Sequence, residues 1–341
     1  MTSKKTLIIF LTLIFTSLFL FNCEDNPTEP VPDPGRRDYV WQADTIQVPF
    51  FYIYRMWGSS PEDVWAVGPG GALSTTIWHY DGESWTTDNI SRGVMPRCIW
   101  GTDKDNVWIG SSENKIWNYN GTNWSENIKF DVSNGNGISF GDIWGTSENN
   151  IYAVGSSGYG ENRIATIAHY NGKEWALMEF PEIHYNFVLI RKEDKTSSSY
   201  FLLGHSEHKM ALFEFDGKAL KLIIEKNQTS NSALGFEEIN DELFFVIDNT
   251  INKYQNGEFT SIIEIESEHF YGRIFGRNKK DIFLSMNNGF AHFNGSEIEY
   301  ICNFRNDMSS DMIVFDKEIF ILSNDLSKDL NIIFRGKYFK N

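Results

Sequence analysis

The sequence predicts an all-β protein folded as a seven-bladed β-propeller, in which four-stranded sheets stand around a central channel. Three observations predict it. A motif returns along the chain about every 40 residues, which is the period of a propeller blade. Six of the seven copies hold short β-rich runs joined by Asp-Gly or Asn-Gly, a dipeptide typical of hairpin turns, and in the seventh copy Gly336 follows Arg335. No segment shows a sustained helical period, which argues against a helical solenoid.

The composition agrees with one large ordered architecture. The chain has 341 residues, of which 15% are aromatic and 22% charged, with 27 Gly and 9 Pro. This length exceeds what a single compact core usually carries, so it requires two domains or one closed ring. The formal net charge is −16 and no basic run alternates with aromatic residues. Nucleic acid is therefore not expected as a partner, and neither is adsorption to an anionic lipid surface.

The first 22 residues have the order of a secretory signal. Lys4 and Lys5 precede an apolar run of 15 residues from Leu7 to Phe21, and Cys23 follows shortly after. The run is too short for a comfortable membrane span. The stretch resembles a bacterial lipoprotein signal peptide, which implies a lipid-anchored protein whose Cys23 is acylated and becomes the new N-terminus. An uncleaved N-terminal membrane anchor is the alternative.

A short tether is expected between the anchor and the first strand. Residues 23–38 begin with Cys23 and continue with five acidic residues and four prolines, a composition typical of an extended linker. The acidic pair after Cys23 is similar to the export signal of surface-exposed lipoproteins in some outer-membrane bacteria. The expected location is the cell envelope, as an outer-membrane lipoprotein that faces the periplasm or the surface, with the propeller formed by residues 39–341.

The repeats begin with three clear copies. Residues 57–85 contain WGSSPEDVWAVG and IWHYDGESW, and residues 100–124 and 144–175 return the same pattern. An apolar-aromatic pair extends the series to seven: Val64-Trp65, Val107-Trp108, Ile151-Tyr152, Tyr200-Phe201, Leu243-Phe244, Ile282-Phe283 and Ile319-Phe320. A second marker follows each pair, a predicted turn glycine: Gly82, Gly121, Gly172, Gly217, Gly257, Gly295 and Gly336. Seven blades are expected.

The N-terminal part of this region is expected to close the ring, because an open ring would leave two unpaired sheet edges. Trp41 to Ile46 (WQADTI) matches Trp85 to Ile90 (WTTDNI), which is a predicted fourth strand. We therefore expect Trp41 to Ile46 to complete the last blade, beside the C-terminal stretch from Lys337 to Asn341.

On these motifs the chain resembles a poorly characterised group of bacterial β-propeller lipoproteins with WG(S/T)…DVWAVG…HYDG…W repeats, and more distantly the kelch and Asp-box propellers. The resemblance covers residues 41–341. It implies the fold and a secreted location, and no reaction. Asp81 and Gly82 are adjacent, whereas the Asp-box separates them by one residue, so the sialidase activity of some Asp-box proteins is not implied.

The sequence contains no assembled catalytic set. HExxH, the phosphate-binding GxxxxGK[ST] and CxxC are all absent. Cys98 and Cys302 lie in non-adjacent copies and are expected to be separate thiols. His205, Glu207 and His208 have the closest spacing to a metal site, but they are interpreted as a solvated loop, and neither a metal nor a cofactor is predicted. The tryptophans, and the recurring His79, His169 and His292, are interpreted as parts of the blade structure.

The candidate binding residues lie at the channel and on the loops of one face. Aligning the first strand of each blade places four side chains on one ring around the channel: Arg55, Cys98, Asp142 and Arg273, with Arg97 beside Cys98. Two arginines could bind a carboxylate or phosphate, or an internal Arg–Asp pair could close the channel. The loop candidates are Tyr159, Arg163, His184, Tyr185, His269, Tyr271 and Arg305.

These features favour a binding or scaffold propeller that recognises a glycan, a peptide or an envelope partner protein through this face. The second hypothesis is a polysaccharide hydrolase or lyase that uses carboxylates such as Asp142 and Glu268 at the channel mouth, which would need them about 5–10 Å apart. A third is a purely structural scaffold. Without a recognisable reactive set, the sequence names no catalytic residue.

Overall fold

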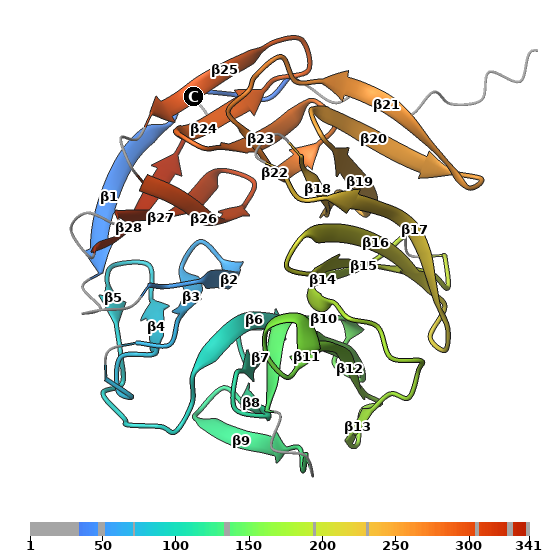
Figure 1. Cartoon of the computed structure of the whole chain (residues 1–341). Helices are drawn as coiled ribbons and strands as arrows, with labels where there is room; N and C mark the ends of the chain where they lie inside the picture. Colours follow the sequence, from blue (N-terminus) through green and yellow to red (C-terminus); the bar gives the residue numbers. More distant parts are fainter. Residues whose placement is uncertain are drawn as a thin grey trace, which may run out of the picture. The chain divides into compact units, whose positions relative to one another are not determined.

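The computed structural model describes residues 34–46, 52–70, 72–132, 137–193, 196–229, 232–303, 307–325 and 330–338. The predicted signal sequence, Cys23 and most of the tether lie outside these ranges. From Pro34 onward the chain forms one compact unit of seven four-stranded antiparallel sheets arranged as a ring (Figure 1). The prediction of a seven-bladed β-propeller is confirmed. A search of the described residues for a helix long and apolar enough to cross a membrane found none.

Six blades are built from four consecutive strands that pair in chain order, and in every blade the first of its consecutive strands lies at the hub. The strands of the first three blades are β2 (Arg55–Ser60), β3 (Asp63–Val67), β4 (Ile77–Tyr80) and β5 (Trp85–Thr86); β6 (Pro96–Asp103), β7 (Asn106–Ser111), β8 (Lys115–Tyr119) and β9 (Trp124–Lys129); β10 (Ile138–Ser147), β11 (Asn150–Ser157), β12 (Ile164–Tyr170) and β13 (Trp175–Leu177). A short 3₁₀ turn, η1 (Gly160–Asn162), precedes β12.

The later blades follow the same plan. Their strands are β14 (Asn186–Lys192), β15 (Tyr200–His205), β16 (Lys209–Phe215) and β17 (Leu220–Asn227); β18 (Leu234–Ile239), β19 (Glu242–Ile247), β20 (Thr250–Gln255) and β21 (Glu258–Glu264); β22 (Phe270–Asn278), β23 (Asp281–Met286), β24 (Gly289–Phe293) and β25 (Ile298–Asn303); and β26 (Asp307–Val314), β27 (Glu318–Asp325) and β28 (Leu330–Lys337), which β1 (Val40–Ile46) joins.

The ring closes in the seventh blade as predicted. Strand β1 is its outermost strand and pairs antiparallel with β28, from Val40 opposite Lys337 to Ile46 opposite Asn331. The predicted partner stretch needs correction, because β1 pairs with residues 331–337 and only Lys337 belongs to the stretch expected. Asn331 strengthens this closure: its buried side-chain amide donates to the Ile46 carbonyl oxygen, and its Oδ1 accepts the backbone N–H of Ile53 in the segment that leads to the first blade.

The turn glycines are confirmed in six copies. Gly82, Gly121, Gly172, Gly217, Gly257 and Gly295 have φ between +83° and +96°, which L side chains rarely adopt. Gly336 is different, because it lies inside β28 opposite Trp41. A Cβ there would lie 2.7 Å from the Trp41 ring, so this glycine makes room for the closing strand. The fourth strand of this blade comes from the N-terminal side of the propeller, so no turn is required after β28.

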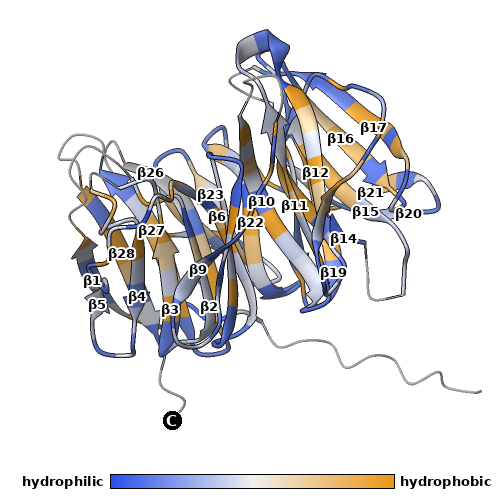
Figure 2. Ribbon diagram, turned by 90° about the horizontal axis from the view of Figure 1, so that it is seen from below, coloured by the Kyte–Doolittle hydropathy of each residue, from blue (hydrophilic) through white to orange (hydrophobic). Residues whose placement is uncertain are grey.

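The apolar-aromatic pairs lie in the second strand of each blade and explain how the blades stack. Successive strand residues point to opposite faces, and each blade face contacts a neighbouring blade. Val64 therefore packs toward Phe320 of blade seven, while Trp65 packs against Tyr119 and Trp124 of blade two. All eleven tryptophans are buried or half-buried, which agrees with their interpretation as core residues. Figure 2 shows apolar residues along the strands.

Antiparallel pairing sorts the connections onto two faces. The loop face carries the connections between blades and those between second and third strands, and the turn face carries the remaining tight turns. The described chain enters at the turn face of blade six, where the Gly35 N–H donates to the Lys280 carbonyl oxygen. Arg37 donates to the side chains of Glu297 and Glu299. The N-terminal segment is therefore held on the turn face.

Candidate functional site

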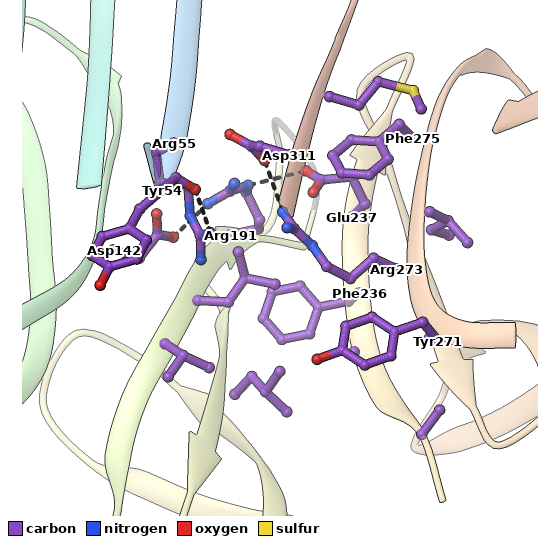
Figure 3. Close-up of a pocket in the computed structure, with 18 of the residues that line it drawn as sticks. Tyr54, Arg55, Asp142, Arg191, Phe236, Glu237, Tyr271, Arg273, Phe275 and Asp311 are labelled. Atoms are coloured by element: carbon purple, nitrogen blue, oxygen red, sulfur yellow. Dashed lines mark hydrogen bonds and ion pairs between the residues drawn. The ribbon is translucent and has the colours of Figure 1, made fainter. Parts of the chain in front are cut away.

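A cavity of about 920 Å³ occupies the hub of the ring. The first strands of all seven blades line it, and His205, Gln228, Thr229, Ser232 and Asn287 line it near the loop face of blades four to six. Its walls combine aliphatic and aromatic side chains with three arginines and four carboxylates (Figure 3). The cavity is the widened central channel, and most of its charges are already engaged within the protein.

The Arg191 cluster, formed by Arg191, Asp142 and Glu237, joins blades three, four and five. Nη1 of Arg191 lies 2.7 Å from Oδ2 of Asp142, and its Nε lies 3.3 Å from Oε1 of Glu237. Oδ2 of Asp142 also accepts the backbone N–H of Ile190 at 3.0 Å. Burial alone would lower the pKa of Arg191, but the two carboxylates outweigh it and raise the pKa above its usual range. This arginine is a charged cross-link between blades.

The Arg273 pair, formed by Arg273 and Asp311, lies in blades six and seven. Nη2 of Arg273 is 2.9 Å from Oδ1 of Asp311, whose Oδ2 accepts the backbone N–H of Met56 at 2.8 Å. The Arg273 guanidinium also lies 5.0 Å from the centre of the Phe275 ring. Asp142 and Asp311 occupy equivalent positions in their blades, and each one fastens its blade to the first strand of the next blade.

Arg55 stands apart from these pairs. It lines the cavity, and Nη1 donates to the Tyr54 carbonyl oxygen at 3.0 Å. Among the described residues no carboxylate lies within ion-pair distance of Arg55. Burial, together with the positive charge of Arg273, lowers the pKa of Arg55 below its usual value, against the opposing influence of Asp311 and Asp142. The guanidinium is close to both carboxylates without direct contact.

The two arginines that the sequence placed on one ring, Arg55 and Arg273, therefore have different surroundings in the structure. Arg273 has an internal partner, but that partner is Asp311 and not Asp142. Asp142 pairs with Arg191, which sequence reasoning missed together with Glu237 and Asp311. The sequence alignment used the glycine of Trp-Gly or Phe-Gly to locate each first strand. Blades four, five and seven could not be aligned in this way, because they carry Lys192, Glu238 and Val314 in place of that glycine. Alignment through the paired aromatic of the second strand would have found them, since Arg191 lies opposite Phe201 and Glu237 opposite Phe244.

Three other predicted residues have structural surroundings. Cys98 is fully buried, with its sulfur facing the Gly110 and Phe140 carbonyl oxygens, and burial together with Asp142 raises the pKa of its thiol. Cys98 and Cys302 are both free thiols, as expected. Arg97 is exposed, with its guanidinium 4.6 Å from the centre of the Tyr54 ring. Tyr185 is buried against Phe213, and its hydroxyl donates to Glu225.

The predicted loop residues separate into two groups. Tyr271 lines the cavity and is 51% exposed. Apart from the buried Tyr185, the other predicted loop residues that the structure describes are exposed on the loop face and do not line the cavity: Tyr159, Arg163, His184 and His269. Arg305 lies outside the described residues. Glu268 is exposed beside His269 and does not line the cavity either, so the structure does not place the carboxylate pair of the hydrolase hypothesis in the cavity.

The three residues with a metal-like spacing in blade four, His205, Glu207 and His208, also lie in different surroundings. His205 lines the cavity, and burial lowers the pKa of its imidazole. Glu207 and His208 are exposed outside it and meet Glu161 of η1, with one ligand atom of each within 4.8 Å of the others. The recurring histidines bond within their blades: His79 to Asp63, His169 to Asn150 and His292 to Asp281, each at 2.7 Å. These three bonds support their structural interpretation.

No protein-family model and no curated protein matches the sequence. Solved structures are similar in fold. A structure described as YCF48 bound to D1 peptide has a TM-score of 0.64 at 15% identity, covering 90% of this chain and 100% of that chain. YCF48 from Cyanidioschyzon merolae has a TM-score of 0.57 at 11% identity, covering 86% and 98%. The WD40 β-propeller domain of Doa1 has a TM-score of 0.57 at 12% identity, covering 87% and 97%. At these identities the likeness establishes the propeller fold alone.

Proposed function

We propose that this protein is a binding propeller that takes a segment of a partner protein into its central cavity from the loop face, and that a lipid on Cys23 anchors it in the cell envelope. The cavity carries the first part of the proposal. Its volume of about 920 Å³ falls in the range of ligand-binding pockets. Its first-strand walls come from a closed ring and are therefore rigid, which limits the entropy lost on binding.

The lining favours a peptide over a sugar. Aliphatic side chains such as Val188, Leu189, Ile274 and Ile313 form much of the wall, and Phe236 and Tyr271 add aromatic surface (Figure 3). A glycan would need many free hydrogen-bonding groups, whereas the Arg191 cluster and the Arg273 pair are engaged with each other. Apolar side chains of an extended peptide fit such walls better. A propeller of similar fold is bound to a peptide, which is consistent with this choice.

The position of the N-terminal segment suits an anchored protein. Gly35 and Arg37 hold this segment on the turn face, opposite the loop face. The chain from Cys23 to Pro34 spans at most about 40 Å when extended. An acyl group on Cys23 would therefore draw the turn face toward the bilayer and leave the loop face accessible to a partner.

The anchor is tested by Cys23→Ala. We expect the variant to leave the membrane fraction and to keep an uncut or differently cut signal sequence, because the acylated residue is lost. Cell fractionation and the mass of the mature chain provide the readouts. Unchanged membrane attachment together with an unchanged mature mass would contradict the anchor.

The binding function is tested with the purified full-length chain on arrays of random-sequence peptides and of bacterial polysaccharides. We expect selected peptides to bind, and Tyr271→Ala to weaken them about tenfold or more, as aromatic contacts in binding sites often do. Tyr159→Ala is the matched control, because Tyr159 is 76% exposed and lies outside the cavity. Binding of polysaccharides alone, or peptide binding that ignores Tyr271, would overturn the proposal.

A further inference from the structure

We propose that the central cavity holds one carboxylate group of the partner segment on Arg55, while Arg191 and Arg273 keep their internal partners. This inference rests on the proposed function and names the chemical group that the cavity recognises. It differs from a site in which two arginines bind the ligand together, because Arg273 is already paired with Asp311 and only Arg55 is left to bind it.

The first argument concerns hydrogen-bond capacity. A guanidinium carries five N–H donors. Arg55 lines the cavity and makes one hydrogen bond among the described residues, to the carbonyl oxygen of the adjacent Tyr54. Figure 3 shows its side chain within the cavity, beside Asp142 and Arg191. Its remaining donors are available to a ligand that enters from the loop face.

The neighbouring carboxylates are not free to neutralise Arg55. Asp142 accepts both Arg191 and the backbone N–H of Ile190, and Asp311 accepts both Arg273 and the backbone N–H of Met56. Turning either carboxylate toward Arg55 would leave a buried backbone N–H without its partner, which is unfavourable. The positive charge of Arg55 is thus preserved by the bonds that fasten the blades together.

Electrostatics favours an incoming anion of a single charge. Burial and the nearby Arg273 both disfavour the charged form of Arg55 in the empty cavity, which lowers its pKa. An anion on Arg55 relieves this penalty. A dianion such as a phosphate monoester would also meet the carboxylates of Asp142, Glu237 and Asp311, which line the same cavity. A carboxylate matches the planar fork of one guanidinium and brings one charge.

The inference is tested with two small probes that differ only in charge. 4-Hydroxyphenylacetate and its neutral amide, 4-hydroxyphenylacetamide, are titrated into the full-length chain by NMR or calorimetry at millimolar concentration. We expect the carboxylate to bind at least about tenfold more tightly, as a charge-assisted bond implies. Arg55→Gln should remove this preference by weakening carboxylate binding to about the level of the amide.

The controls keep the result interpretable. Arg163→Gln makes the same change of charge at an exposed residue outside the cavity and should retain the preference. Arg55→Lys keeps the positive charge but loses the planar guanidinium, and it should retain part of the preference for the carboxylate probe. Equal binding of the two probes, tighter binding of phenyl phosphate, no binding of the carboxylate, or a preference that persists in Arg55→Gln would each overturn the inference.

Peptides selected on the array separate this inference from the function on which it rests. Each hit is compared as free acid and C-terminal amide, and with Glu replaced by Gln, which distinguishes a terminal from a side-chain carboxylate. Peptides that depend on Tyr271 but bind Arg55→Gln unchanged would overturn the carboxylate and leave the function standing. Failure of all peptides would overturn the function, and the probe titrations would still decide whether Arg55 binds a carboxylate.

Discussion

Blades one to three and blades four to five use one ring position in opposite ways. Opposite the second-strand aromatic, the first group carries Trp57, Trp100 and Trp144, whereas the second carries Arg191 and Glu237. A Cβ added to Gly101 would lie 2.8 Å from the Trp57 ring, and one added to Gly145 would lie 2.9 Å from the Trp100 ring, so these two tryptophans fill the space left by a glycine of the next blade. In blades four and five an ion pair takes this place.

This comparison shows that the propeller tolerates two kinds of inter-blade contact at its hub. Trp–Gly packing depends on volume and has no need of a partner charge, while the Arg191 cluster depends on each charge being matched. A buried ion pair contributes little net stability compared with apolar packing, but breaking one is costly. The charged part of the hub therefore creates a polar wall beside the cavity, and the tryptophan part provides rigid packing.

The largest expected effect comes from opening the ring at blade seven, where β1 closes it. Deleting residues 39–47 removes β1 and leaves β28 as an exposed edge. We expect a loss of stability on the scale of a whole domain, about 5 kcal/mol or more, in a single calorimetric transition. An unchanged melting temperature would show that the last blade closes without β1. Two separate transitions would show that the tryptophan blades and the later blades unfold independently.

Breaking the Arg191 cluster should have the next largest effect. Arg191→Gln leaves the buried Asp142 and the half-buried Glu237 without their cation, so we expect a loss of about 3–5 kcal/mol in denaturant unfolding. Arg55→Gln should change stability by less than about 0.5 kcal/mol, because no carboxylate depends on it. Equal losses in the two variants would mean that Arg55 is also an internal structural charge.

The Trp–Gly contacts can be tested at Gly101. The Cβ of Gly101→Ala would meet both the Trp57 ring and the Asn106 carbonyl oxygen at 2.8 Å. We expect a loss of about 1–3 kcal/mol from overpacking, measured by thermal or denaturant unfolding. Gly93→Ala is the control, because its nearest neighbour is 3.8 Å away and its stability should change little. A neutral Gly101→Ala would show that the hub of blades one to three is loosely packed.

The smallest effect is confined to acid pH and compares the recurring His bonds. Burial alone would raise the pKa of Asp281, but the bond from His292 and the ion pair with Arg277 outweigh it and lower the pKa. Because the folded pKa is depressed, this stability is present above the unfolded pKa of about 3.9 and is lost as pH falls through the folded value. Asp281→Asn should give blade six a His–Asn hydrogen bond like the one between His169 and Asn150 in blade three, which contains no carboxylate to protonate. A melting temperature that falls equally between pH 5 and 3 in both proteins would contradict this.

The sequence by itself determined the ring. The apolar-aromatic pairs mark all seven second strands, and six turn glycines mark the hairpins, because strand and turn preferences are local and repeat with the blade. The match between residues 41–46 and 85–90 also predicted the closing strand, since Trp41 and Trp85 both lie in outer fourth strands, although the strand of blade one ends at Thr86. Gly336 misled as a turn marker because the chain order changes at the seventh blade, a fact that concerns connection and not local preference.

Only the tertiary structure decided which charges meet at the hub. Asp142 and Arg191 lie 49 residues apart, and Arg273 and Asp311 lie 38 apart, on strands of different blades. The distance from the first-strand position to its paired aromatic also varies, since Arg191 is opposite Phe201 while Glu237 is opposite Phe244. Which charged side chains pair depends on their positions in three dimensions, and the spacing of residues along the sequence does not predict those positions. For the same reason only the folded ring leaves Arg55 without a partner carboxylate among the described residues.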